Sequence, residues 1–148
     1  MTEAADALAI MAVQNAYAVA IDQQDWAALR RCFTPDATIS FGMPLQVGTL
    51  DEFMDWAPDF HGRLARTLHQ VSTHQVAFQG QVAVASCYLH AVLVDASREK
   101  ATSVFGRYDD ELVRTGDRWA IRQRRFRPTW LSTSTSTSTS ASVEGPRG

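Results

Sequence analysis

Four stretches rich in β-branched and aromatic residues follow one another in the second half of the chain. They span residues 66–78, 82–95, 102–114 and 118–126, and only the short segments "QG", "ASREK" and "TGD" separate them. Strand-like stretches joined by such short turns predict an antiparallel meander. The chain must therefore build one long sheet and bury one of its faces.

The first half of the chain is predicted to be mainly helical and supplies the cover for that face. Apolar residues at 3/4 spacing predict a helix over 2–21, and they are Ile10, Val13, Tyr17 and Ile21. A short helix is expected over 26–33 and a strand over 37–42. A capping-box pattern at Thr49 opens a third helix, which Pro58 is expected to limit. Helices first and strands last predict an α+β fold with helices over one face of a curved sheet.

Length and composition fit one folded domain, which we expect to span residues 1–130. Of the 148 residues, 45% are hydrophobic, enough for a core. The Ser/Thr-rich segment 131–148 contains no apolar residue larger than valine after Leu131, so we expect a disordered tail. The net charge of −2 favours neither nucleic acid nor an anionic membrane as a partner. No apolar run approaches the roughly 18 residues of a membrane span, and the acidic start is unlike a secretory signal, so we expect a cytoplasmic protein.

Three of the four histidines lie between residues 66 and 91 and raise the question of a metal site. His69 and His74 are five residues apart, which places them on opposite faces of a regular strand, so they could share a metal only across a bulge. No HxH or HExxH pattern occurs, so we expect neither a metal site nor a cofactor. His90 is expected on the outer face of the sheet, and His61 in a solvated loop.

A histidine on a concave sheet face can instead act as a general base, because its pKa lies near neutrality. The face that His69 shares with Val71 and Thr73 mixes polar and apolar residues, which suits a pocket. A histidine that only satisfies a hydrogen bond in the core or at the surface fits the same pattern. Strand periodicity alone does not decide between these alternatives.

Three segments resemble the SnoaL-like family of the nuclear-transport-factor-two-like superfamily, in the branch near scytalone dehydratase and bile-acid 7α-dehydratase. The first segment carries Tyr17, Asp22, Trp26 and a "PDA" turn at 35–37. The second is "RTLH" at 66–69, and the third is "GRYDDELVRTGDRWAIRQR" at 106–124. The resemblance covers about residues 7–130. It implies a cone-shaped, strongly curved antiparallel sheet whose N-terminal helices enclose a cavity.

The resemblance also implies a catalytic site. In these dehydratases a histidine on the strand after the third helix pairs with the aspartate that ends the first helix. Matching through "RTLH" implies His69 as that histidine and Asp22 as its partner, with Tyr17 as a further catalytic residue. Such a pair orients an imidazole for general acid–base chemistry.

The surrounding shell departs from the dehydratase pattern toward apolar residues. Positions that hold polar groups in the dehydratases match Phe41, Ala91 or Leu93 here, so a more apolar substrate is implied. The basic run "RQRRFR" at 122–127 is predicted to be a solvated strand, with arginines at the cavity mouth as the alternative. The expected substrate-binding residues are Tyr108, Phe41, Trp26, Ala91, Leu93, Arg124 and Phe126.

The resulting expectation is a lyase or cyclase that needs no cofactor and acts on a small hydrophobic metabolite bearing a carbonyl. Dehydration, double-bond isomerisation and polyketide-type ring closure remain open. The alternatives are a non-catalytic ligand-binding or dimerisation module, or a structural subunit like the β-subunits of ring-hydroxylating dioxygenases. The apolar outer face around Tyr88 and His90 predicts a homo-oligomer, most simply a dimer.

Overall fold

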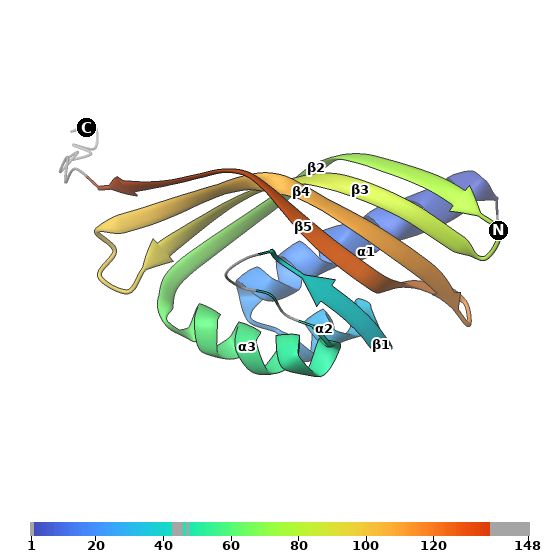
Figure 1. Ribbon diagram of the computed structural model, residues 1–148, viewed down its shortest axis with the longest axis horizontal. Helices are drawn as coiled ribbons and strands as arrows, with labels where there is room; N and C mark the ends of the chain where they lie inside the picture. Colours follow the sequence, from blue (N-terminus) through green and yellow to red (C-terminus); the bar gives the residue numbers. More distant parts are fainter. Residues whose placement is uncertain (1, 43–45, 47, 137–148) are drawn as a thin grey trace, which may run out of the picture.

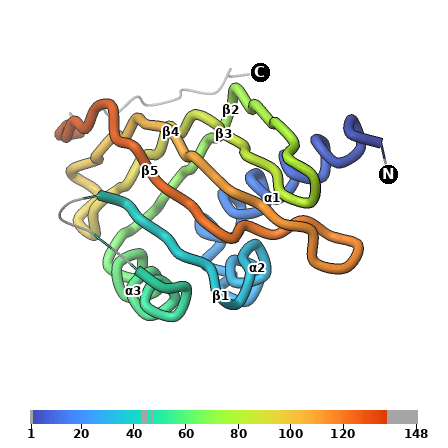
Figure 2. Tube along the Cα trace, turned by 45° about the vertical axis from the view of Figure 1, so that its right-hand side comes forward, coloured from blue at the N-terminus to red at the C-terminus, as the bar shows by residue number. Residues whose placement is uncertain are grey.

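One five-stranded sheet dominates the computed structural model, which describes residues 2–42, 46 and 48–136. The strand order is β1-β5-β4-β3-β2, and the four long strands pair antiparallel. Only β1 runs parallel to its neighbour β5 in the described part of the chain (Figure 2). The strands are β1 (Phe33–Ser40), β2 (Leu64–Gln79), β3 (Val82–Asp95), β4 (Lys100–Thr115) and β5 (Arg118–Thr135).

Three helices lie together on one side of this curved sheet, as the sequence predicts (Figure 1). They are α1 (Glu3–Gln23), α2 (Trp26–Arg31) and α3 (Leu50–Gly62). The predicted capping box opens α3, where the Thr49 side chain and the Glu52 side chain each bond the other's backbone N–H.

Small residues on β3 make the space in which α1 packs. The inward-facing positions Ala83, Ala85 and Cys87 are all buried, and so are Ile10 and Tyr17 of α1. These short side chains belong to the same core cluster as Ile10 and Tyr17. Toward the other end of β3, Leu89, Ala91 and Leu93 line a cavity.

Helix α1 is long and apolar enough to cross a membrane by length and composition alone. Its buried face nevertheless carries Asp6 and Gln14, which bond to Arg114, Trp119 and Asp110 of the sheet. These contacts identify α1 as the core helix of the domain.

Several predicted boundaries are wrong. The strand predicted over 37–42 is β1, which begins at Phe33, so residues 35–37 of the expected "PDA" turn lie within the strand. Pro58 does not end α3, which continues to Gly62. The buried stripe Leu50, Phe53, Ala57 and His61 holds the helix together beyond the one backbone bond that a proline removes.

The folded domain does not end at residue 130 either, because β5 runs on to Thr135 and pairs with β4 from Lys100 to Val104. Alternating Ser and Thr can take this strand conformation because β4 satisfies their backbone groups. Residues 137–148 of the predicted tail lie outside the described residues.

The prediction that His69 and His74 face opposite sides of the sheet is also wrong. The register of β2 against β3 shifts between Ser72 and Gln75, and Thr73 has a φ of 54°. This bulge adds one residue to the strand. The burial of β2 alternates with one parity up to Val71 and the opposite parity from His74, so both histidines face the helices.

Candidate active site

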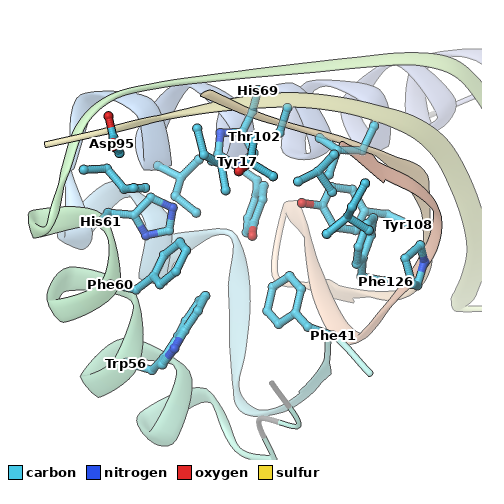
Figure 3. A pocket seen from close by; sticks show the side chains of 18 of the residues that line it. Tyr17, Phe41, Trp56, Phe60, His61, His69, Asp95, Thr102, Tyr108 and Phe126 are labelled. Atoms are coloured by element: carbon cyan, nitrogen blue, oxygen red, sulfur yellow. The ribbon is translucent and has the colours of Figure 1, made fainter. Parts of the chain in front are cut away.

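A cavity of about 400 Å³ lies between the concave face of the sheet and the helices α1 and α3 (Figure 3). Its lining is mainly apolar. The residues that line it are Tyr17, Ile21, Phe41, Trp56, Phe60, His61, Leu64, His69, Leu89, Ala91, Leu93, Asp95, Lys100, Thr102, Val104, Tyr108, Phe126, Pro128 and Leu131. A volume of this size accommodates a small ring compound.

The carboxylate of Asp22 and the ring of His69 form the contact that the family resemblance implies. His69 Nδ1 lies 2.7 Å from Asp22 Oδ1, and the His69 backbone N–H donates to Oδ2 at 2.8 Å. The Thr67 hydroxyl donates a third hydrogen bond to Oδ1, also at 2.8 Å. Burial opposes the charge of the Asp22 carboxyl, but these donors more than offset it and hold its pKa below the usual range.

An ionised Asp22 fixes the orientation of the His69 ring. The carboxylate can only accept, so His69 Nδ1 donates, and in the neutral ring Nε2 is left with its lone pair. The His69 side chain is 7% exposed and lines the cavity, whereas Asp22 lies behind it. The geometry therefore holds the His69 imidazole in a fixed orientation at the wall of an apolar cavity, an arrangement suited to accepting a proton.

Two tyrosines from opposite layers, Tyr17 of α1 and Tyr108 of β4, meet beside this histidine in the cavity wall. Their ring centroids are 5.6 Å apart in an edge-to-face arrangement (Figure 3). Burial raises the pKa of both phenols, so both hydroxyls stay protonated at neutral pH. A protonated phenol can donate a hydrogen bond.

Arg124 lies behind these tyrosines and does not reach the cavity or its mouth, contrary to its predicted role as a binding residue. Its guanidinium is 4.2 Å from the Tyr17 ring and 4.0 Å from the Tyr108 ring. It also makes two bonds of 2.7 Å to the buried Asp110 carboxylate. A fully buried arginine paired in this way is part of the core.

Two further arginines of the basic run are paired with acids across the sheet. Arg122 bonds to Glu111, and Arg127 bonds to Asp109. These cross-strand pairs occupy the partly exposed strand positions that the sequence predicts.

His61, expected in a solvated loop, is instead buried and lines the cavity. The reason is that α3 continues past Pro58, which places His61 one turn after Ala57. Its Nδ1 lies 2.8 Å from the Ala57 carbonyl oxygen. The spacing of four residues between Phe53, Ala57 and His61 is the sequence signal that indicates a buried His61, if the helix is taken to continue past Pro58.

Trp26, also expected to bind substrate, lies behind the wall. Its ring packs against His61 with centroids 6.0 Å apart. The other predicted binding residues do line the cavity, and they are Phe41, Ala91, Leu93, Tyr108 and Phe126. Leu131 joins them from the segment that the sequence places outside the domain.

The remaining two histidines serve other parts of the fold. His74 Nδ1 bonds to the Gln14 side-chain oxygen at 2.7 Å. Gln14 in turn donates to Asp110 at 2.9 Å. His90 stacks on Phe105 on the outer face, with ring centroids 4.2 Å apart. Neither lines the cavity.

Comparison with known proteins gives one family match and many similar structures. The model of the SnoaL-like domain matches residues 2–125. A protein of Mycobacterium tuberculosis described as uncharacterised is 29% identical over 126 residues, which are 84% of this chain and 86% of that protein.

Three solved structures have the same fold. A putative aromatic ring hydroxylase from Novosphingobium aromaticivorans is 26% identical, with a TM-score of 0.81 and coverage of 90% of this chain and 96% of that one. A putative scytalone dehydratase from the same organism is 18% identical, with a TM-score of 0.78 and 84% coverage of both chains. A hexachlorocyclohexane dehydrochlorinase from Novosphingobium barchaimii is 12% identical, with a TM-score of 0.76 and coverage of 85% and 88%.

Proposed function

Because the chain belongs to the SnoaL-like family, we propose that it is a lyase that removes a proton beside a carbonyl and expels a neighbouring leaving group. The observation that carries the proposal is the Asp22–His69 contact at the wall of an apolar cavity. Two of the similar structures are named for eliminations, a dehydratase and a dehydrochlorinase.

The chemistry begins at His69. Nε2 takes the proton from the carbon beside the carbonyl, and Asp22 stabilises the imidazolium that results. The negative charge moves to the carbonyl oxygen, where the Tyr17 or Tyr108 hydroxyl donates a hydrogen bond. When a hydroxyl is the leaving group, the new C=C bond forms as the C–O bond breaks. The leaving oxygen takes the proton back from His69 and departs as water.

The cavity lining supports a hydrophobic substrate. Aromatic and aliphatic side chains from α3, β4 and β5 surround the space beside His69 (Figure 3). Burying an apolar body there contributes roughly 25 cal/mol per Å² of surface removed from water. We therefore propose a small hydrophobic carbonyl compound as the substrate.

Exchange of the acidic protons of 2-tetralone for deuterium tests the first chemical step. We expect the protein in D2O to accelerate this exchange, followed by ¹H NMR, over buffer alone. His69→Gln should lower the rate by about 100-fold or more, because general base catalysis contributes about 10²–10⁴-fold. Asp22→Asn should lower it as well, because the amide no longer fixes the ring.

His74→Gln is the matched control, since His74 lies on the same strand and the same face but outside the cavity. This variant should exchange 2-tetralone at the wild-type rate. A wild-type rate in His69→Gln, or no acceleration by the wild type, contradicts the proposal.

A second candidate is a structural subunit of an aromatic ring hydroxylase, which the 26% identity to a putative ring hydroxylase favours. That role does not need an oriented histidine in the cavity. It predicts a stable complex with a larger catalytic chain in native mass spectrometry, and equal exchange rates in the wild type and His69→Gln.

A further inference from the structure

A second histidine ring, His61, faces the same end of the cavity and takes no part in the proton transfer described above. The centroids of the His61 and His69 rings are 6.1 Å apart (Figure 3). The residue is 3% exposed, so only the cavity gives access to it.

The hydrogen bond to Ala57 determines which nitrogen carries the proton. A carbonyl oxygen only accepts, so Nδ1 donates to it over 2.8 Å. Burial lowers the pKa of His61, so its ring is neutral at pH 7. Its Nε2 is therefore an acceptor with a free lone pair.

Aromatic packing holds this ring in one orientation. Trp26 and Trp56 each lie 6.0 Å from it between centroids, and Phe60 lies at 5.2 Å. Among the described residues, no side chain or backbone group donates a hydrogen bond to Nε2. Because His61 lines the cavity, a ligand without a donor that fills it would leave this acceptor buried and unpaired, whereas a ligand that donates to it avoids that cost.

We propose that His61 is a specificity-determining residue whose Nε2 accepts a hydrogen bond from a hydroxyl group of the substrate. The inference rests on the proposed function for the position of the carbonyl at His69. It narrows the substrate class to hydroxylated carbonyl compounds, with the hydroxyl a few bonds from the carbon that loses its proton. An analogue without the hydroxyl leaves Nε2 unpaired and binds more weakly.

Two probes of nearly equal shape test this selection by calorimetry. 2-Naphthol carries a hydroxyl donor, and 2-methoxynaphthalene carries none. We expect the wild type to bind 2-naphthol about tenfold or more tightly. His61→Phe keeps an aromatic ring in the Trp26–Trp56 packing and should bind the two probes equally. His74→Gln, the control outside the cavity, should keep the wild-type preference.

NMR of the wild type alone tests the same contact without relying on a variant that folds. Long-range ¹H–¹⁵N spectra should show His61 as the Nδ1–H tautomer. Addition of 2-naphthol should move the His61 Nε2 resonance, and addition of 2-methoxynaphthalene should not.

Two results overturn the inference. The first is equal binding of the two probes by the wild type. The second is a preference for 2-naphthol that persists in His61→Phe, whether or not His69→Gln loses it. Deuterium exchange of 2-tetralone uses a probe without a hydroxyl. If the protein does not accelerate the exchange but still prefers 2-naphthol through His61, only the proposed function is contradicted. If it accelerates the exchange but shows no such preference, only this inference is contradicted.

Discussion

At the scale of single residues, the site depends on which atom of each histidine is already bonded. His69 and His61 both use Nδ1, one toward the Asp22 carboxylate and the other toward the Ala57 carbonyl. In both neutral rings the lone pair on Nε2 is then left for the cavity. The carboxylate suits a ring that must accept a proton during a reaction, whereas the carbonyl adds no charge to a ring that stays neutral.

The lowered pKa of His61 predicts a pH-dependent stability. Below pH 6.5, the ordinary pKa of histidine, this residue binds a proton in the unfolded chain but stays largely neutral in the folded chain. The free energy of unfolding should therefore fall as the pH drops from 7.5 toward 5, by at most about 1.4 kcal/mol per unit below 6.5 for this group. Urea denaturation of the wild type and His61→Gln at several pH values measures the difference.

The His61→Gln variant should lose less stability over this range. It should still lose some, because burial also lowers the pKa of His74 and gives an effect of the same sign. Parallel pH profiles for the two proteins contradict the neutral, buried state assigned to His61.

At the scale of elements, irregularities in the strands position the cavity wall. The bulge at Thr73 turns the second half of β2 so that His74 faces α1 and bonds Gln14. A second irregularity lies between Phe105 and Gly106 on β4, opposite β5. There Gly106 allows the Phe126 ring and the Arg127 carbonyl to approach the β4 backbone.

Gly106→Ala should destabilise the protein and disturb the cavity. An added Cβ would meet the Arg127 carbonyl oxygen at 2.5 Å and a Phe126 ring carbon at 2.4 Å. Overpacking of this kind costs roughly 1–3 kcal/mol, measurable as a lower urea midpoint. Gly62→Ala is the control, because nothing lies within 4 Å of a Cβ at that position. Equal loss of stability in both variants contradicts the role given to Gly106.

At the scale of the whole molecule, the outer face of the sheet exposes several large apolar side chains to solvent. Each of the four long strands contributes at least one exposed large side chain to it, among them Leu68, Tyr88, Phe105 and Trp130. Their exposed fractions lie between 39% and 63%. We propose that a second copy of the chain covers this face, since contiguous apolar patches of this kind are typical of interfaces.

Sedimentation equilibrium should therefore show a dimer of the described domain. Tyr88→Glu combined with Trp130→Glu should shift it toward monomer by placing charges in the patch. Val19→Glu alters an equally exposed apolar residue on α1 and should leave the dimer intact. A wild type that sediments only as monomer contradicts this proposal.

The sequence by itself determined the elements and their order, because periodicity reports the local backbone and the face that each residue occupies. It also indicated His69 and Asp22 as a pair, through motifs 47 residues apart that resemble one family. Only the tertiary structure decided the rest. A one-residue bulge reversed the face of His74, packing carried α3 past Pro58 and buried His61, and pairing with β4 extended β5 to Thr135. Each of these outcomes depends on contacts with residues distant in the chain, which no local pattern records.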